Sequence, residues 1–476
     1  MRYEIQLPDN KSLKIRRMVL AYVRGAEIPP VSDMDGSDVR VTWRALQVMA
    51  HAKRMGANTM TTIDVADCGA AYRFLMPVLA ATPGTWLLTG TPRLLQRPVL
   101  PLVEVLRGIG AEIERVEDGW LIRGRLFDRA VGTLRATSLQ RGNSFPCHVE
   151  TRHGTSLQRG KPETDNDNDG GLSLILDATQ SSQMASALVM AAPLLGLRTL
   201  NLTTTDIPSL SYLRMTLALV RDWSVTAVGR NADPPNMTLA LARDWPVEIP
   251  GVEMPDVPIG APGDWSAALF WFAHARLHPE NEYVLSPLSL ESIQGDAVIT
   301  KWFRMLDVSV SCRDAARVRD AKFCVSTPSC NENAVSKRNE NLSTPCIEII
   351  AKPLSEKPRM VLDVRDNLDT VPVMAALAAL LPADVTFQNV RNLRYKESDR
   401  LEALTEQLAP YAEIELSDNV LRVKGKDGAI VQSRGFETHR DHRLAMAFLL
   451  FPGAVLDDVG CLEKSYPGLL EQIKSE

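Results

Sequence analysis

The repeated pattern that predicts the fold is seen best in residues 371–408, VPVMAALAALLPADVTFQNVRNLRYKESDRLEALTEQL. An almost wholly apolar stretch of helical length ends at Pro382, and a short β-rich run follows it. A polar loop then leads into a second stretch whose apolar residues recur with helical spacing. We therefore predict a helix, a strand, a loop and a second helix, in that order.

The same order of elements recurs along the chain. The copies cover Tyr72–Glu114, Ser182–Val228 and Val371–Ile414, and fainter ones begin near Lys11, Asp264 and His442. Self-similar units of this length are typical of repeat architectures. Six such units predict an α/β repeat fold built from two similar halves.

Two polar stretches interrupt this pattern. In residues 137–171 the hexapeptide TSLQRG occurs twice, and residues 311–344 are rich in Asn, Ser, Arg and Asp. Both stretches are poor in periodic apolar residues, so they cannot bury enough surface to fold on their own. We predict that they are disordered insertions.

The composition limits the class of protein. The chain has 476 residues, of which 45% are hydrophobic and 23% are charged, as in a globular protein of two to three domains. It has no uninterrupted apolar run of about 18 residues and no apolar core near its N-terminus, which argues against a membrane span and a signal peptide. Seven cysteines, an odd number, argue against a complete disulfide framework. We therefore expect a cytoplasmic protein with no membrane partner.

Charge and motifs exclude several kinds of partner. The net charge is −5, from 53 basic and 58 acidic residues, so a nucleic-acid partner is not expected. No phosphate-binding glycine loop and no HExxH motif is present, and the cysteines at 312, 324, 330 and 346 lack metal-site spacing. We predict no metal site and no cofactor, and any anion site must use a few placed cations.

Three polar segments are candidates for such a site. The loop from Asn392 holds Lys396, Glu397 and Arg400, which suits an anion whose reaction needs a proton, although a salt-bridged surface helix has the same pattern. His442 and Arg443 open an apolar helix, where anions are attracted.

The third segment, Ser181, Ser182 and Gln183, precedes another apolar helix. Its hydroxyls suit either a helix cap or a phosphate. Asp369 is likewise either a helix N-cap or a general base, and the sequence leaves both open.

Further cations lie in matching places of the repeats. Lys11, Ser12 and Arg16 form a short basic run at the first predicted helix. Arg93 and Arg97 lie in the loop TPRLLQRP, and Lys464 lies in the corresponding loop of the last unit. Each pattern alone is also compatible with an ordinary solvated surface.

Taken in order, these segments resemble the EPSP synthase (5-enolpyruvylshikimate-3-phosphate synthase) family of enolpyruvyl transferases. The resemblance is carried by RYKESDR at 394–400, DHR at 441–443, TGTPRLLQRP at 89–98 and SSQ at 181–183. It extends from Leu7 to Lys464, apart from the two insertions. It implies two lobes of three βαβαββ units each, residues 1–10 with 256–476 and residues 11–255, in a protein that is usually a monomer.

The resemblance also implies a reaction and its residues. The enolpyruvyl group of phosphoenolpyruvate would pass to the 5-hydroxyl of shikimate 3-phosphate, releasing phosphate, with Asp369 as base, Glu397 as acid and Lys11 beside them. Shikimate 3-phosphate would be bound by Lys11, Ser12, Arg16, Ser181, Ser182, Gln183, Ser209, Tyr212, Asp369, Asn392 and Lys396. Phosphoenolpyruvate would be bound by Lys11, Gly69, Arg97, Gln183, Arg400, His442, Arg443 and Lys464.

The chain departs from the family pattern at one loop in particular. The usual N-A-G-T-A-x-R is DCGAAYR at 67–73, with Asp67 in place of asparagine and Ala70 in place of threonine. A carboxylate near a doubly anionic substrate weakens its binding unless Arg73 pairs with it.

Three alternatives follow from these observations. Asp67 suggests a non-catalytic protein that binds shikimate 3-phosphate, and Cys68 suggests the sister transferase acting on UDP-N-acetylglucosamine, although the surrounding residues differ from that branch. RNA 3′-phosphate cyclase shares repeat units of this kind but needs a basic face, which the charge balance does not indicate.

Overall fold

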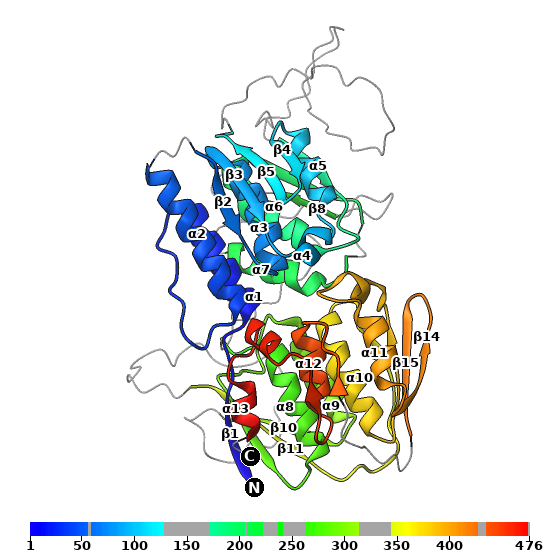
Figure 1. Cartoon of the computed structure of the whole chain (residues 1–476). Helices are drawn as coiled ribbons and strands as arrows, with labels where there is room; N and C mark the ends of the chain where they lie inside the picture. The colour runs from blue at the N-terminus through cyan, green and yellow to red at the C-terminus, as the bar shows by residue number, and fades with distance from the viewer. Residues whose placement is uncertain are drawn as a thin grey trace, which may run out of the picture.

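The computed structural model describes residues 1–55, 59–127, 172–204, 207–221, 237–240, 262–313, 344–426 and 435–474. These residues form two hydrophobic cores, one built from residues between Leu13 and Val220 and one from Ile5, Leu7 and residues between Trp265 and Leu469. We call the described residues 11–240 the upper lobe, and the described residues 1–10 and 262–474 the lower lobe (Figure 1). Both chain ends lie in the lower lobe (Figure 1).

The sheets repeat one arrangement of strands. In the upper lobe, β2 (Thr61–Asp64) runs parallel to β3 (Gly84–Thr89), β3 pairs antiparallel with β5 (Gly119–Gly124), and β5 pairs antiparallel with β4 (Glu112–Val116). The sheets β12-β13-β15-β14 and β1-β9-β11-β10 of the lower lobe have the same order and directions. In the upper lobe β6-β7-β8 repeats the first three positions. The predicted recurrence of one α/β unit is therefore present in the backbone.

The remaining strands have the following bounds: β1 (Arg2–Gln6), β6 (Leu172–Leu176), β7 (Leu197–Leu202), β8 (Met237–Ala240), β9 (Glu282–Ser286), β10 (Val308–Arg313), β11 (Cys346–Ala351), β12 (Arg359–Asp363), β13 (Asp384–Gln388), β14 (Ala412–Leu416), β15 (Val420–Gly425), β16 (Gly435–Phe436) and β17 (Val455–Leu456).

Helices connect the strands and fill the cores. In the upper lobe they are α1 (Lys11–Arg24), α2 (Ser37–Met55), α3 (Gly69–Ala80), α4 (Pro92–Gln96), α5 (Leu100–Gly108), α6 (Ser182–Leu195) and α7 (Leu210–Arg221). In the lower lobe they are α8 (Trp265–Leu277), α9 (Ile299–Arg304), α10 (Val371–Leu380), α11 (Arg400–Leu408), α12 (His442–Phe448) and α13 (Leu469–Lys474), with the 3-10 helices η1 (Gly295–Val298), η2 (Leu368–Thr370), η3 (Arg391–Tyr395) and η4 (Gly460–Lys464).

The predicted apolar stretch at 371–381 forms α10, which is buried along almost its whole length and packs against α12. A helix that is apolar on every side is stable only at the centre of a core. In the upper lobe α3 and α6 pack against each other in the same way. These central helices start at the lobe interface, so their first residues lie between the two lobes.

Within the described residues, the segments at 8–10 and 262–264, where the lobes join, are bound to each other. Asp9 forms a β-bridge with Gly263, and the backbone N–H of Asp264 donates to the carbonyl of Pro8 at 3.0 Å. The Gln294 amide accepts from Asn10 at 2.7 Å and donates to Gly263 at 2.8 Å. This junction fixes the start of α1, and with it Lys11 and Ser12.

The two predicted insertions lie almost entirely outside the described residues. Residues 137–171 fall wholly outside them, while residues 311–313 at the start of the second stretch belong to β10 and residue 344 leads into β11. No helix in the described ranges is long and apolar enough to cross a membrane.

Candidate active site

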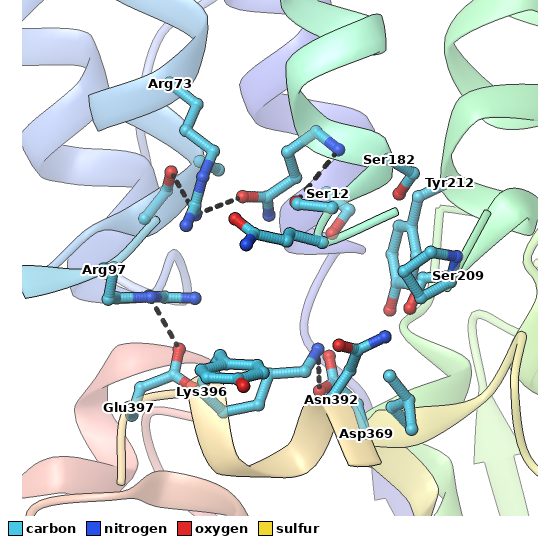
Figure 2. Close-up of a pocket in the computed structure, with 18 of the residues that line it drawn as sticks. Ser12, Arg73, Arg97, Ser182, Ser209, Tyr212, Asp369, Asn392, Lys396 and Glu397 are labelled. Carbon is cyan, nitrogen blue, oxygen red and sulfur yellow. Dashed lines mark hydrogen bonds and ion pairs between the residues drawn. The ribbon is translucent and has the colours of Figure 1, made fainter. Parts of the chain in front are cut away.

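A cavity of about 910 Å³, partly open to solvent, lies between the lobes (Figure 2). Most of the residues predicted to bind a substrate line it. The upper lobe contributes Lys11, Ser12, Gly69, Arg97, Ser181, Ser182, Gln183, Ser209 and Tyr212, and the lower lobe contributes Asp369, Asn392, Lys396, Glu397 and His442. Segments far apart in the sequence are thus brought to one place.

These residues meet because they follow the carboxyl ends of parallel strands. Gly69 begins the helix after β2, Arg97 follows β3, and Ser182 begins the helix after β6. In the lower lobe Asp369 follows β12 and Asn392 follows β13. In open α/β sheets this edge is where ligands bind, and helix N-termini there present unpaired N–H groups.

The structure shows which cap roles, among those that the sequence left open, are present. The Ser181 hydroxyl caps α6 by accepting a hydrogen bond from the N–H of Gln183 at 3.2 Å. Ser181 and Ser182 also both line the cavity. Asp369 does not cap α10, whose N-cap is Thr370 without a side-chain bond. The Asp369 carboxylate instead binds cations of the site.

Arg400 joins the two carboxylates expected to move protons. Its Nη1 lies 2.8 Å from Asp369 Oδ1, and its Nη2 lies 3.0 Å from Glu397 Oε2. The guanidinium is held from behind by Asp441, whose Oδ2 is 2.8 Å from Nε. Lys396 adds a second contact to Asp369 at 3.1 Å. Because Arg400 is 1% exposed, the arrangement of the two acids is rigidly determined.

Both acids are held in their ionised form. Burial raises the pKa of the Asp369 carboxyl, but Lys396, Arg400 and Arg443 outweigh burial and keep this pKa well below its usual range. Burial likewise opposes ionisation of Glu397, and Arg97, Arg400 and Lys464 hold its pKa well below the usual range. Each carboxylate therefore carries a full charge as long as these cations remain beside it.

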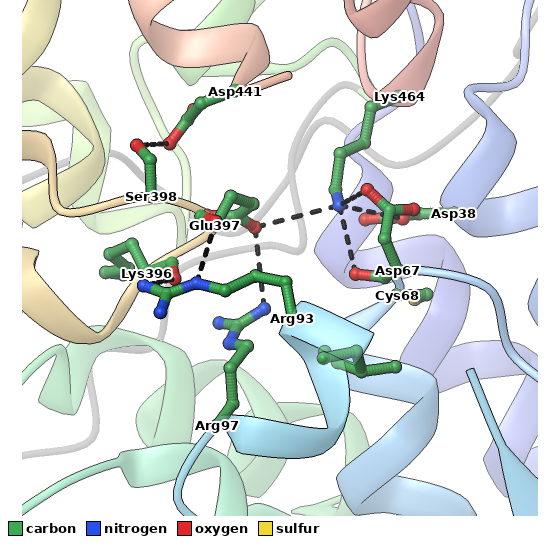
Figure 3. A network of polar contacts seen from close by, with 12 residues as sticks. Asp38, Asp67, Cys68, Arg93, Arg97, Lys396, Glu397, Ser398, Asp441 and Lys464 are labelled. Atoms are coloured by element: carbon green, nitrogen blue, oxygen red, sulfur yellow. Dashed lines mark hydrogen bonds and ion pairs between the residues drawn. The ribbon is translucent and has the colours of Figure 1, made fainter. Parts of the chain in front are cut away.

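A second charged cluster surrounds Lys464 and joins residues of both lobes (Figure 3). Its ammonium contacts the Asp67 carboxylate, donates to the Asp67 carbonyl at 3.0 Å, and lies 3.8 Å from Asp38 and 3.9 Å from Glu397. Lys11 pairs with the same Asp38 at 2.9 Å. Two lysines expected to bind a substrate anion thus share carboxylates supplied by the protein.

The partner of Asp67 differs from the one considered in the sequence. Arg73 does not pair with it, since its guanidinium donates to Gln183 at 2.8 Å and to the carbonyls of Pro98 and Gly69. Burial and the neighbouring Arg97 lower the pKa of Arg73 to about 9. Asp67 is neutralised by Lys464, which comes from the opposite lobe.

Four predicted cations lie behind the cavity wall rather than on it, namely Arg16, Arg400, Arg443 and Lys464. Arg16 is buried and donates to Thr216 at 2.7 Å and to the carbonyls of Ser12 and Tyr212. Arg443 donates to the carbonyl of Ser266, and Arg400 binds the two acids as described. In this arrangement Arg16 positions two wall residues.

His442 is a wall residue of a different kind. Its imidazole is buried and its Nδ1 has no hydrogen-bond partner. Burial, Lys11 and Arg443 hold the pKa of His442 well below its usual range, so the ring is neutral. A neutral ring beside several cations can bind an anion without adding another charge to the site.

Several site residues were not found from the sequence. Asp38 and Tyr395 line the cavity, and Asp441 orients Arg400 and accepts from Ser398 at 3.0 Å. Asp441 lies in the DHR segment, directly before His442. The sequence therefore indicated its position near the site, but not that it binds Arg400. Asp38 lies in the first turn of α2, in a region without a motif, and only its contacts reveal it.

Groups of three or more histidine, cysteine or acidic side chains that could hold a metal ion are not found among the described residues.

The chain matches the family model described as EPSP synthase (3-phosphoshikimate 1-carboxyvinyltransferase) over residues 35–123 and 156–473. The 3-phosphoshikimate 1-carboxyvinyltransferase of Bacteroides fragilis is 28% identical over 99% of this chain and 94% of its own length. The enzyme of that name from Syntrophobacter fumaroxidans is 27% identical, over 98% and 95% of the two chains.

Solved structures share the fold at lower identity. EPSP synthase from Acinetobacter baumannii superposes with a TM-score of 0.58 at 16% identity, covering 100% of this chain and 95% of its own. The enolpyruvyl transferase NikO from Streptomyces tendae gives 0.53 at 14% identity, over 99% and 94%. These likenesses confirm the predicted enolpyruvyl transferase fold.

Proposed function

Since the chain belongs to the EPSP synthase family, we propose that it transfers the enolpyruvyl group of phosphoenolpyruvate to the 5-hydroxyl of shikimate 3-phosphate and releases phosphate. The relatives of that name extend over nearly the full length of both chains, which supports the same acceptor here. At this identity the acceptor is the part of the proposal that most needs a direct test.

The observation that carries the proposal is the placement of Asp369 and Glu397 on one cavity wall, joined by Arg400 and facing cations of the other lobe. Addition of an alcohol to phosphoenolpyruvate needs a base for the hydroxyl proton and an acid for the methylene carbon. Asp369, ionised by its neighbours, would accept the first proton as the oxygen–carbon bond forms. Glu397 would supply the second proton to the methylene group.

The cations beside Glu397 explain how this residue becomes protonated before it donates to the methylene carbon. Arg97 lies 3.7 Å and Lys464 lies 3.9 Å from its Oε1. When the phosphate and carboxylate of phosphoenolpyruvate take these cations, the charges that lower the pKa of Glu397 are neutralised, and this pKa rises. Glu397 would then take up a proton from solvent when phosphoenolpyruvate binds, and so become the acid. In the second step a proton of the new methyl group returns to Glu397 as the bond between carbon and the phosphate oxygen breaks. The phosphate would leave with the proton that Asp369 accepted.

The remaining wall residues suit the acceptor. Ser181, Ser182 and Ser209 supply hydroxyl groups at the starts of two helices, where a phosphate is favoured by the helix dipole. Lys396 and Asn392 reach the cavity from the lower lobe. A rigid acceptor bound by both lobes would hold its hydroxyl group beside Asp369.

Release of phosphate by the purified protein, with both substrates and with each omitted in turn, tests the proposal. We expect release only when both are present, and none from unphosphorylated shikimate at the same concentration. Thermal stabilisation by shikimate 3-phosphate without phosphate release would instead support the non-catalytic binding protein, which the Asp67–Lys464 ion pair favours because it occupies a lysine needed by phosphoenolpyruvate.

A further inference from the structure

Arg93, which the proposed reaction does not use, reaches from the upper lobe to the backbone of the lower lobe (Figure 3). It lies in α4, four residues before Arg97. Its Nε donates to the carbonyl of Glu397 at 3.2 Å, and its Nη2 donates to the carbonyls of Lys396 at 3.3 Å and Arg394 at 3.4 Å. One guanidinium therefore holds the backbone that carries two of the site residues.

The position of these carbonyls explains why an arginine suits them. They lie at the end of η3 and just beyond it, and the last carbonyls of a helix have no partner within the helix. A planar guanidinium offers several donors in a fixed geometry, and its charge suits a helix C-terminus. Arg93 thus caps a helix that belongs to the other lobe.

A contact of the opposite sense runs from the lower lobe to the upper lobe. Asp366 Oδ1 accepts from the N–H of Leu210 at 2.9 Å, at the first residue of α7, and the Asp366 carbonyl accepts from Ser211 Oγ at 3.0 Å. A carboxylate at a helix N-terminus satisfies an unpaired N–H and is favoured by the dipole. Asp366 lies three residues before Asp369 in the same segment.

Ser209, the cavity residue before α7, depends on this contact. Its φ is 57°, in the left-handed region that residues other than glycine rarely adopt. Such a conformation persists only where the surroundings hold it. Here the N–H of Ser209 donates to the carbonyl of Arg365 at 2.8 Å, and Asp366 binds the next residue. The lower lobe thus holds a residue of the upper lobe in a strained position.

We propose that Arg93 and Asp366 are positioning residues that cap helices of the opposite lobe and so couple contact between the lobes to assembly of the site. Arg93 places Lys396 and Glu397, and Asp366 places Ser209. The expected kinetic effects rest on the proposed function. The expected structural effects rest on the contacts alone. Arg93 acts on the acid Glu397, and on the acceptor through Lys396, whereas Asp366 acts on the acceptor alone. An effect on kcat therefore separates the two residues by experiment.

Steady-state kinetics of two variants should show one effect on kcat and the other on KM. Arg93→Ala lowers kcat by about tenfold or more, because a displaced acid loses its near-attack geometry. Asp366→Ala raises KM for shikimate 3-phosphate by about fivefold, as expected for loss of one helix cap, and changes kcat little. Asp366→Asn keeps an acceptor oxygen, so it restores most of the affinity for shikimate 3-phosphate. Arg93→Lys has one ammonium group in place of the planar guanidinium, so it restores little of kcat.

Matched controls are Arg123→Ala and Glu413→Gln, whose exposed ion pairs with Glu112 and Lys424 lie within one lobe. Both controls should leave kcat and KM unchanged. If Arg93→Ala and Asp366→Ala leave kcat and KM unchanged as the controls do, the proposal is wrong. It is also wrong if Asp366→Ala lowers kcat while Arg93→Ala leaves kcat unchanged.

Amide hydrogen exchange gives a readout that does not need turnover. Without substrates, Asp366→Ala should lose protection in a peptide containing Leu210, and Arg93→Ala should lose it in a peptide spanning 391–400, while β12 and β13 stay protected. Unchanged exchange at both places overturns the proposal even if the enzyme is active. Loss of protection in a protein that shows no phosphate release keeps the two caps and rejects the proposed reaction.

Discussion

Lys464 of the lower lobe forms its shortest ion pair with Asp67 of the upper lobe, at the edge of the proposed phosphoenolpyruvate site (Figure 3). Lys464 is 3% exposed, whereas the Asp67 side chain is 45% exposed. Burial alone would lower the pKa of the lysine, but Asp38, Glu397 and Asp67 raise it above its usual value. The ammonium is therefore always charged, and its charge is already compensated by the protein.

This pair predicts that Asp67 limits the affinity for phosphoenolpyruvate. Substrate must compete with the Asp67 carboxylate for Lys464 and also approach that negative charge. Asp67→Asn should therefore lower KM for phosphoenolpyruvate by about two- to fivefold, the size expected for one partly exposed ion pair. Initial rates at saturating shikimate 3-phosphate and varied phosphoenolpyruvate measure this KM directly.

Asp67→Glu is the matched control, because it keeps the charge and should not lower KM. An unchanged or higher KM in Asp67→Asn would mean that the carboxylate positions Lys464 for the substrate instead of competing with it. A shallower dependence of KM on salt in the wild type than in Asp67→Asn would agree with competition, because salt also screens the repulsion by Asp67.

Glu397→Gln should cut kcat by at least about a hundredfold, the usual scale for loss of a general acid. The amide has the shape of the carboxylate but cannot deliver a proton to the methylene carbon. Binding of shikimate 3-phosphate, measured by calorimetry, should stay within about twofold of the wild type. Near wild-type turnover in this variant would remove Glu397 from the role of acid.

Gly69→Ala should weaken phosphoenolpyruvate binding through Arg97. A Cβ placed on Gly69 would overlap the guanidinium of Arg97, so the arginine must move. The Arg97 side chain is only 9% exposed, and it has little room to move without leaving the cavity wall. We expect KM for phosphoenolpyruvate to rise by about tenfold or more, with KM for shikimate 3-phosphate nearly unchanged. Equal rises in both KM values would instead mean that the added methyl group disturbs the whole cavity and not Arg97 in particular.

The fold was predictable because its signal is local and repeated. The apolar run at 371–381 has to be a buried helix, and the run around Val385 and Phe387 alternates as a strand does. The same sequence pattern at Tyr72–Glu114 gave the same strand order in the other lobe. What the sequence could not show is how the lobes meet, since that depends on contacts such as Asp9 with Gly263.

The site was predictable where a residue stands at a helix start, and not where its role depends on distant partners. Ser182 and His442 begin apolar helices, and both line the cavity. Arg16 has the spacing of a ligand, one turn after Ser12, yet its donors are used by Thr216 and backbone carbonyls. Asp38 has no local pattern at all, and only its contacts with Lys11 and Lys464 give it a role.

The lowered pKa of Asp369 predicts how stability depends on pH. In the unfolded chain this pKa is about 3.9, and in the folded protein it lies well below that value despite burial, because of Lys396, Arg400 and Arg443. The carboxylate therefore stabilises the fold above about pH 4, and its contribution is lost as the pH falls through the folded value. Asp369→Asn should unfold more easily than the wild type at pH 6, by about 1 to 3 kcal/mol.

Urea unfolding at pH 6, 5, 4 and 3 measures this difference. It should stay constant from pH 6 to about pH 4 and then shrink, because only the wild type loses a stabilising charge there. Asp384→Asn is a useful comparison, since Asp384 has a lowered pKa from Arg422 but its side chain is 24% exposed, so the effect should be small. A difference between wild type and Asp369→Asn that does not change down to pH 3 would mean that folding leaves the pKa of Asp369 unchanged, and one that grows would mean that folding raises this pKa. Either result would contradict the ion pairs with Lys396 and Arg400.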